Sequence, residues 1–319
     1  MIAGAHIAGT GIFIPSKQVT NEDLSEMVDT SDRWIQTRTG IKTRYLVDPN
    51  NPVTLIDMAE QAALQALGSS QTRPEELDMI IVATGTQDER LPSAACLLQY
   101  RLGAHKACAF DIAAACAGSL HALGIANRFL DGQKYKNILV VGAEILSGVL
   151  DWTDRNTCVL FGDAASAAVL KPGIGFIDFD FYADGSLWQN IWMPHGGKIQ
   201  MKGQETFKSA VRVLTQAVEH ILEKNHLKPE NIHQVIAHQA NLRILEAISD
   251  RIRIPIEKFM INIHRYANTS SASLLLTYHE AKVLNRIQPG DWVLMMSVGA
   301  GFVWGVALYK TPTVKKNKN

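Results

Sequence analysis

The sequence predicts an α/β fold of layered helices and sheets, and three observations support this prediction. Short apolar runs of strand type alternate along the chain with longer segments whose apolar residues recur at helical spacing. A Pro-Glu turn followed by an apolar strand occurs in each half of the chain, at Pro74 and again at Pro229. Polar residues gather where predicted strands end, which is where α/β folds place their functional groups.

The first half of the chain supplies three helices, each followed by a strand. The helices are predicted from apolar residues three and four positions apart, and the strands from short runs that are apolar on both faces. In order, the predicted elements are a helix at 55–67, a strand at 78–84, a helix at 94–102, a strand at 107–112, a helix at 117–130 and a strand at 137–142.

The second half repeats this arrangement. An amphipathic helix precedes the turn at Pro229, a strand follows that turn, and two further strands flank the turn Gly299-Ala-Gly301. In order, the predicted elements are a helix at 206–224, a strand at 233–238, a helix at 270–284 and two strands between 292 and 309.

The two Pro-Glu turns indicate an internal duplication. They lie 155 residues apart, close to half of the 319-residue chain, and each is preceded by a predicted helix. We therefore expect two α/β halves, 1–172 and 173–319, divided at Lys171-Pro172-Gly173. Because no low-complexity linker joins them, the halves should pack around one core.

The composition argues against several classes of protein. The formal net charge is zero, whereas a nucleic-acid-binding surface normally needs a cationic excess. No apolar stretch approaches the roughly 20 residues that a membrane-spanning helix needs, and residues 1–15 lack the basic leader of a signal peptide. We expect a cytoplasmic protein without nucleic-acid or membrane partners, and a solvated basic tail at 315–318.

The four cysteines form neither a disulfide pattern nor a zinc pattern. They are Cys96, Cys108, Cys116 and Cys158, and no CxxC pair or histidine cluster accompanies them. We therefore expect no bound metal. Cys96, Cys108 and Cys158 fit buried structural positions, which is the usual place of an unpaired cysteine.

Cys116 instead has the surroundings of a nucleophile. In Asp111-Ile-Ala-Ala-Ala-Cys116-Ala-Gly, a predicted strand gives way to small residues and then to a cysteine at the start of a helix. Small neighbours let a substrate approach the sulfur. A helix N-terminus favours the thiolate and so lowers the thiol pKa.

His238 and Asn268 are two further candidates. His238 ends a predicted strand, where a lone histidine is more often a core or cap residue than a catalyst. In Tyr266-Ala-Asn268-Thr269-Ser270, either Thr269 or Ser270 is expected to cap the following helix. The expected cap leaves Asn268, just ahead of it, unexplained.

Together these segments closely resemble β-ketoacyl-acyl-carrier-protein synthase III, the initiating condensing enzyme of bacterial fatty acid synthesis. The segments around Cys116, His238 and Asn268 carry the resemblance most strongly. Others match the family in the same order: Thr30-Ser-Asp-Arg-Trp34-Ile-Gln-Thr-Arg38, Pro92-Ser-Ala-Ala-Cys96, Thr153-Asp-Arg155, Phe161-Gly-Asp and Gly299-Ala-Gly301-Phe-Val-Trp-Gly.

The resemblance implies a homodimer with a thiolase-like fold, in which two duplicated βαβαβαββ halves stack in five αβαβα layers. It implies a decarboxylative Claisen condensation of a short acyl-CoA, acetyl-CoA first, with malonyl-acyl carrier protein. Cys116 would hold the acyl group as a thioester, and the backbone amides of Cys116 and Ala300 would bind the oxyanion. His238 and Asn268 would donate hydrogen bonds to the malonyl thioester. No metal or redox cofactor takes part.

The resemblance also assigns residues to the binding of substrates and of the partner subunit. For CoA they are Trp34 and Arg155 around the adenine, with Arg38, Gly203, Phe207 and Asn241 along the tunnel. For the acidic carrier protein they are Lys208, Arg243 and Arg251. Leu91 would reach the partner's acyl pocket. Because the family often has a bulky aromatic residue in this loop, we expect a pocket that admits primers longer or more branched than acetyl.

Other functions fit the sequence less well. A condensing enzyme or acyltransferase of secondary metabolism would use the same three residues with another acceptor, and acyl-carrier-protein dependence would separate the two. A hydroxymethylglutaryl-type condensation needs an added general-acid glutamate, for which the sequence offers no clear candidate. A non-catalytic homologue would usually lack the nucleophile. A papain-like thiol hydrolase places its residues in a different chain context.

Overall fold

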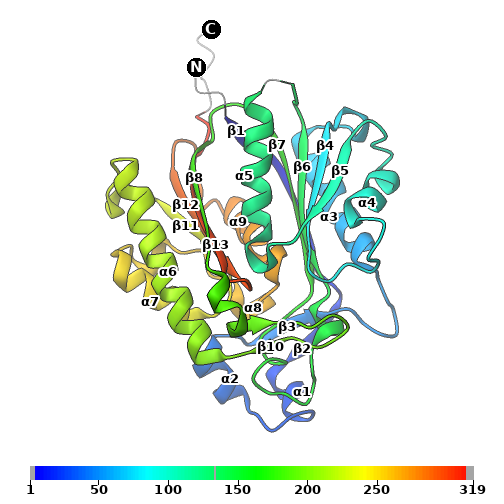
Figure 1. Cartoon of the computed structure of the whole chain (residues 1–319), viewed down its shortest axis with the longest axis vertical. Coiled ribbons are helices and arrows are strands. Elements are labelled where there is room, and N and C mark those ends of the chain that lie inside the picture. The colour runs from blue at the N-terminus through cyan, green and yellow to red at the C-terminus, as the bar shows by residue number, and fades with distance from the viewer. Residues whose placement is uncertain (1–3, 133, 314–319) are drawn as a thin grey trace.

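Two large β-sheets form the centre of the molecule (Figure 1). The computed structural model describes residues 4–132 and 134–313, so the predicted basic tail at 315–318 lies outside the described residues. The strands are β1 (Ala5–Phe13), β4 (Met79–Ala83), β5 (Cys108–Ile112), β6 (Ile138–Glu144), β7 (Ala164–Pro172), β8 (Phe176–Ala183), β11 (Gln234–Ala237), β12 (Trp292–Gly299) and β13 (Val303–Lys310). The first sheet has the order β1-β7-β6-β4-β5, and the second has the order β11-β12-β13-β8.

The two sheets repeat one topology. β1 pairs antiparallel with β7 as β8 does with β13, and β4 pairs parallel with β6 as β11 does with β12. The place of β5, parallel to β4, is taken in the second sheet by one isolated parallel bridge between Val235 and Phe259. The expected turns are 3-10 turns, Pro74–Glu76 and Pro229–Asn231. These correspondences support the duplication. The division at 172/173 would fall between β7 and β8 and stays a prediction.

Helices lie between the sheets and on both outer faces, which gives five layers in the order αβαβα (Figure 1). The central layer holds α5 (Gly118–Asp131) and α9 (Ser273–Val283). The outer layers hold α3 (Leu55–Ser70) with α4 (Ala94–Leu102), and α6 (Gly203–Lys224) with α7 (Leu242–Ile252). α9 is buried on nearly every side, as a helix between two sheets must be, whereas α6 buries one face. The predicted fold class is confirmed.

A smaller group of elements lies below the sheets in Figure 1, and the sequence patterns do not predict it. It contains β2 (Lys17–Thr20), α1 (Asn21–Ser25), α2 (Asp32–Thr39), β3 (Thr43–Leu46), β9 (Ile191–Trp192), β10 (Gln200–Met201) and α8 (Ile263–Tyr266). Arg44 in β3 is fully buried and donates to Asn21 Oδ1 at 2.8 Å and to the backbone oxygen of Val159 at 2.9 Å. These hydrogen bonds connect β3 to α1 and to the segment before β7.

The predicted helices and strands all occur, with bounds within three residues of those expected, and α6 begins at Gly203 instead of 206. The burial expected for the unpaired cysteines is right for Cys158 but wrong for Cys96 and Cys108. Cys108 is exposed because β5 is the edge strand of its sheet. Cys96 is exposed because it lies outside the buried face of α4.

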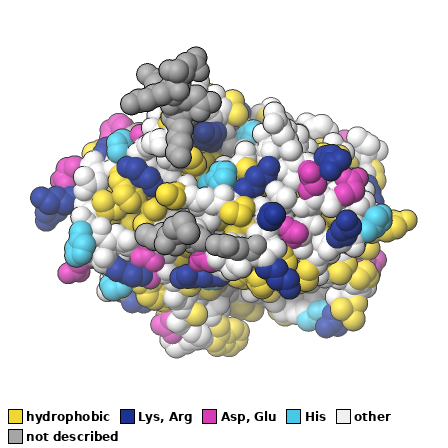
Figure 2. Space-filling view, turned by 90° about the horizontal axis from the view of Figure 1, so that it is seen from above, with side chains coloured by type: hydrophobic (Ala, Val, Ile, Leu, Met, Phe, Trp, Pro, Cys, Tyr) yellow, Lys and Arg dark blue, Asp and Glu magenta, His cyan; other side chains and the backbone are white. Residues whose placement is uncertain are grey.

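Side chains of both charges are interspersed on the surface shown in Figure 2, with apolar groups between them. This mixed surface agrees with the zero formal net charge of the sequence. Within the part of the chain that the structure describes, no helix combines the length and the apolar character that crossing a bilayer requires.

Candidate active site

Residues from both halves line a cavity of about 900 Å³. Cys116, His238 and Asn268 all lie in its wall, although the chain separates them widely. The structure also brings to this cavity Trp34, Arg38, Gly203, Phe207, Lys208, Asn241, Arg243 and Ala300. Three predicted site residues do not line it: Leu91, Arg155 and Arg251. Leu91 is 86% exposed, as a side chain that reaches a second subunit would be, and that role stays a prediction.

Cys116 lies between β5 and α5, as the sequence predicts. A 3-10 turn at Ala115–Ala117 leads directly into α5. Ala115 has a φ of 44°, a left-handed conformation that is strained for a residue with a side chain. A Cβ on Gly299 would lie 2.7 Å from the Cys116 amide nitrogen. Only glycine therefore lets the 299–301 turn come this close to the Cys116 amide.

Burial raises the pKa of the Cys116 thiol to about 11, which is opposite to the direction expected from the helix N-terminus. Cys116 is half-buried in the cavity wall, so protein atoms replace part of the water around the sulfur. A hydrogen bond from Ser270 opposes this increase in pKa, and the negative charge of Glu144 adds to it. The sequence indicates that Cys116 lies at the start of a helix, but it does not indicate how deeply the turn that carries Cys116 is buried. The resting group is therefore the thiol, which must lose its proton to become a nucleophile.

His238 and Asn268 meet in the cavity through a hydrogen bond of 2.9 Å between Nε2 and Oδ1. His238 follows β11, and Asn268 follows α8. The Ser270 amide donates to the same Oδ1 at 2.8 Å, so the Asn268 side chain stabilises the turn that leads to α9. The expected cap by Thr269 or Ser270 is wrong, because the N-cap of α9 is Ala272 and no side chain caps the helix.

Burial also determines the charge of His238. Its side chain is 5% exposed, and the loss of water lowers its pKa to about 4, while the hydrogen bond with Asn268 acts in the opposite direction. The imidazole is therefore neutral at pH 7. Because an amide oxygen can only accept a hydrogen bond, Nε2 carries the proton in this pair. The cavity thus holds a neutral donor beside the nucleophile.

Trp34, Arg38 and Arg155 form one stacked group beside the cavity. The guanidinium of Arg38 lies 4.8 Å from the centre of the Trp34 ring, and that of Arg155 lies 5.3 Å from it. Arg155 also donates to the backbone oxygen of Asp29 at 2.9 Å. Trp34 and Arg155 therefore stack on each other, as expected, and their role in binding CoA stays a prediction.

The remaining binding candidates lie in α6 and at the start of α7 or within it. Asn241 caps this helix by accepting from the Arg243 amide at 2.9 Å, and its Nδ2 donates to the backbone oxygen of Arg38 at 3.0 Å. Asn241 thus has a structural role in addition to lining the cavity. The Arg243 guanidinium lies 5.7 Å from the centre of the Phe207 ring. Arg251 is exposed in the last turn of α7, about 12 Å further along the helix axis.

Glu144 is a cavity residue that the sequence patterns do not single out. It ends β6, is 1% exposed and accepts hydrogen bonds from Gly85, Thr86 and Ser270. A charged residue at the carboxyl end of an apolar strand is a signal for such a group, but the predicted strand, 137–142, ends before it. Within the described residues, no group of three or more His, Cys, Asp or Glu side chains could hold a metal ion.

Two family profiles match this chain. The profile of 3-oxoacyl-[acyl-carrier-protein (ACP)] synthase III matches residues 110–185, and the profile of the C-terminal part of the same enzyme matches residues 222–311. The β-ketoacyl-[acyl-carrier-protein] synthase III of Aquifex aeolicus is 46% identical over 310 residues, which cover 96% of this chain and 99% of the relative. The enzyme of that name from Xylella fastidiosa is 44% identical over 319 residues, with 96% and 98% covered.

Solved structures agree with this match. The 3-oxoacyl-[acyl-carrier-protein] synthase III of Aquifex aeolicus superposes with a TM-score of 0.94, covering 96% of this chain and 100% of that one. The enzyme of that name from Pseudomonas aeruginosa PAO1 has a TM-score of 0.92 at 31% identity, with 97% and 99% covered. A priming β-ketosynthase from the R1128 polyketide pathway has a TM-score of 0.92 at 30% identity, with 97% and 96% covered.

Proposed function

The chain belongs to the β-ketoacyl-[acyl-carrier-protein] synthase III family of acyl-transferring condensing enzymes, and we propose that it joins a short acyl-CoA to malonyl-acyl carrier protein. Acetyl-CoA is the expected first substrate. The products are a 3-oxoacyl-acyl carrier protein, CO₂ and CoA, at the start of fatty acid synthesis. The single observation that supports this proposal best is the meeting of Cys116, His238 and Asn268 in one cavity.

Cys116 would take the acyl group first. Its thiolate attacks the carbonyl carbon of the acyl-CoA thioester, CoA leaves as a thiolate, and the acyl group stays on the sulfur. The backbone N–H groups of Cys116 and Ala300 would bind the oxyanion of the tetrahedral intermediate. The missing Cβ of Gly299 supports this role, because it lets the two turns that carry these amides approach each other.

His238 and Asn268 would serve the second half-reaction. Loss of CO₂ from the malonyl group leaves an enolate, whose oxygen needs neutral hydrogen-bond donors. The Ser270 amide holds Asn268 Oδ1, which leaves the Nδ2 hydrogens for the substrate. His238 would add its Nε2–H when the enolate oxygen replaces Asn268 Oδ1 as its acceptor. The enolate carbon then attacks the acyl thioester, and Cys116 leaves as a thiolate.

Substrate delivery would use the groups around this cavity. Trp34 and Arg155 would separate to admit the adenine of CoA between them, and Lys208 with Arg243 would face the acidic carrier protein. In a homodimer, Leu91 would reach the acyl pocket of the other subunit. The reaction needs no metal or redox cofactor, because hydrogen bonds stabilise the charge of the enolate. The substrates are water-soluble, which suits an enzyme of the cytoplasm.

Product formation from radiolabelled acetyl-CoA and malonyl-acyl carrier protein tests this function, with the wild type beside Cys116→Ser. We expect acetoacetyl-acyl carrier protein from the wild type alone, because a serine hydroxyl is a weak nucleophile at neutral pH. Label on Cys116 without condensation would keep the acyl transfer but point to another acceptor. Absence of label from the wild-type enzyme would refute the catalytic proposal.

One structural neighbour supports a second candidate function, a condensing enzyme of a specialised pathway. The R1128 priming β-ketosynthase is 30% identical and has the same fold, so this architecture also serves polyketide synthesis. The assay above separates the two when it is repeated with a carrier protein of fatty acid synthesis and with one of polyketide synthesis. A strong preference for the polyketide carrier would favour the second function.

A further inference from the structure

Glu144 lies in the wall of the cavity with Cys116, and none of the steps proposed for Cys116, His238 and Asn268 uses it. A carboxyl group that is 1% exposed is costly to keep in a protein, because burial disfavours its charged form. Such a group needs either a structural or a functional reason, and its hydrogen bonds indicate which of these applies.

Both carboxyl oxygens of Glu144 receive hydrogen bonds. Oε2 accepts from the Thr86 hydroxyl at 2.7 Å and from the Gly85 amide at 3.1 Å. Oε1 accepts from the Ser270 hydroxyl at 3.1 Å. A carboxylate can accept all of these bonds at once, whereas a protonated acid would need an acceptor for its own hydrogen. The site is therefore arranged for the ionised form, although burial raises the pKa of Glu144.

Ser270 connects Glu144 to the nucleophile. Its hydroxyl is also a hydrogen-bond partner of the Cys116 thiol, and its φ of 49° holds it in a strained turn. This turn packs against the turn that carries Cys116. While the thiol keeps its proton, the Ser270 hydrogen is donated to Glu144, and the Ser270 oxygen can accept the hydrogen of the thiol. Once the thiolate has formed, the Ser270 hydroxyl donates to the sulfur instead, which is the bond that lowers the pKa of Cys116. The three groups thus form a chain that runs from the sulfur to the carboxylate.

We propose that Glu144 receives the proton of Cys116 through Ser270 and so generates the thiolate that attacks acyl-CoA. The thiol hydrogen passes to Ser270 Oγ while the hydroxyl hydrogen of Ser270 passes to Glu144 Oε1. This leaves a thiolate, an unchanged serine and a neutral carboxylic acid. CoA leaves as a thiolate and takes a proton from water. After condensation Cys116 leaves as a thiolate, and the same two transfers in reverse restore the thiol and the carboxylate.

The charges around the pair favour this route. A thiolate beside an ionised Glu144 would place two negative charges together in a buried site, and transfer of the proton between them leaves only one. Burial raises the pKa of both groups, so both prefer to hold the proton. The other titratable or cationic groups that line the cavity are His238, Arg38, Lys208 and Arg243. His238 is a poor base here, because its pKa is lowered to about 4.

The reactivity of Cys116 toward iodoacetamide tests this relay without any acyl substrate. The rate is followed from pH 6 to 9 by peptide mass spectrometry, since the exposed Cys96 and Cys108 also react. The variants are Glu144→Gln, Glu144→Asp and Ser270→Ala. Glu280→Gln is the matched control, because Glu280 is another buried glutamate with side-chain donors, Asn262 and Tyr266, and does not line the cavity. Thermal unfolding confirms that each variant is folded.

We expect Glu144→Gln and Ser270→Ala to slow alkylation of Cys116 near pH 7 on the order of 100-fold, the usual contribution of a general base. Glu144→Asp should restore part of the rate, and Glu280→Gln should leave the pH profile unchanged. A faster reaction in Glu144→Gln would overturn the proposal, because loss of a neighbouring negative charge alone favours the thiolate. An unchanged rate would overturn it as well and would leave Glu144 a structural role.

The proton relay rests on the proposed function only in that acyl-CoA supplies the acyl group that Cys116 accepts. The relay and the proposed function can therefore fail separately. Transfer of labelled acetyl from acetyl-CoA is measured on the same variants. If the wild type accepts no acetyl group but alkylation depends on Glu144 and Ser270 as expected, the proposed substrate is wrong and the relay stands. If acetyl transfer is normal in Glu144→Gln, the relay is wrong and the proposed function stands.

Discussion

At the scale of single residues, the contribution of Asn268 can be measured apart from that of Cys116, because the two would act in different half-reactions. We expect Asn268→Ala to keep the acylation of Cys116 and to lower condensation on the order of 100–1,000-fold, since one oxyanion donor is lost. Single-turnover labelling measures the first rate, and product formation measures the second. Asn225→Ala is the control, because it removes a side-chain amide that donates to Asp178 and does not line the cavity. An equal loss in both half-reactions would contradict this division of roles.

His238 also links the stability of the fold to pH. Its pKa is about 4 in the folded protein and 6.5 in its ordinary state, so between these values the unfolded chain binds a proton that the folded chain does not. The free energy of unfolding should therefore fall as the pH decreases from 6.5 toward 4, and by roughly 2 kcal/mol at pH 5 from this residue.

Urea unfolding of the wild type and of His238→Gln at pH 7 and pH 5 measures this contribution. The variant should lose less stability between the two pH values, by about 2 kcal/mol. Four other histidines with lowered pKa values, His6, His121, His264 and His279, are present in both proteins, so their effects cancel in the difference. The same loss in both proteins would show that His238 is not buried in its neutral form.

The sequence predicts where Cys116, His238 and Asn268 stand along the chain better than it predicts their surroundings. Each lies at the end of a predicted strand or just before a predicted helix, and those positions depend on local patterns. The pKa of Cys116 depends on how deeply its turn is buried, which is set by contacts with the 299–301 turn far along the chain. Such contacts leave no local pattern. Glu144 is missed for another reason, because the predicted strand 137–142 ends before it although β6 extends to Glu144.

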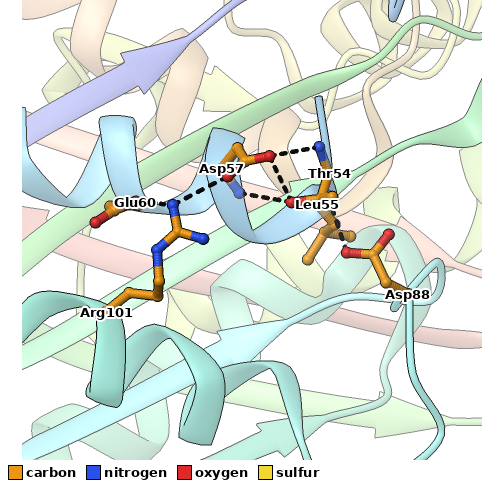
Figure 3. Close-up of polar contacts among 6 residues, drawn as sticks. All are labelled: Thr54, Leu55, Asp57, Glu60, Asp88 and Arg101. Carbon is orange, nitrogen blue, oxygen red and sulfur yellow. Dashed lines mark hydrogen bonds and ion pairs between the residues drawn. The ribbon is translucent and has the colours of Figure 1, made fainter. Parts of the chain in front are cut away.

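At the scale of elements, the N-terminus of α3 shows how a small cap can matter more than a salt bridge (Figure 3). Thr54 and Asp57 form a capping box, and Asp88 accepts from the Leu55 amide at 3.1 Å. Arg101 of α4 pairs with Asp57 at 3.0 Å, but the Arg101 side chain is 43% exposed. The cap satisfies backbone groups that have no other partner, whereas the ion pair competes with water.

We therefore expect Thr54→Ala to lower the free energy of unfolding by about 1 kcal/mol. Arg101→Ala should lower it by less than about 0.5 kcal/mol although Arg101 also pairs with Glu60, because such pairs are screened by solvent. Urea unfolding at low and high salt measures both variants, and only the effect of Arg101→Ala should shrink with salt. A larger loss from Arg101→Ala would contradict this ranking.

The elements that the sequence patterns miss depend on distant pairing. β7 contains the run Ala-Ala-Ser-Ala-Ala, which has little β-propensity, and it is a strand because β1 and β6 bind it on both sides. β1 pairs with residues more than 150 positions away, from Ala5 with Pro172 to Phe13 with Ala165. β4, by contrast, is five buried apolar residues in a row, and such a run can be recognised without its partners.

At the scale of the whole molecule, the chain carries no net charge, so attraction of an acidic carrier protein would depend on where single cations lie. Lys208 and Arg243 line the cavity, whereas Arg251 lies about 12 Å from Arg243 along α7. That distance exceeds the Debye length of roughly 8 Å at physiological ionic strength, so Arg251 should contribute little at the cavity.

We therefore expect Lys208→Glu to raise the KM for malonyl-acyl carrier protein about tenfold at low salt, the range typical of lost electrostatic steering, with kcat nearly unchanged. Arg251→Glu should raise it less than about twofold, since solvent screens the charge at that distance. Lys282→Glu, the same change at an exposed position that does not line the cavity, is the control. High salt should remove most of the difference between Lys208→Glu and the wild type, because screening weakens the attraction in the wild type. An equal effect of Lys208→Glu and Arg251→Glu would instead place the carrier protein across both α6 and α7.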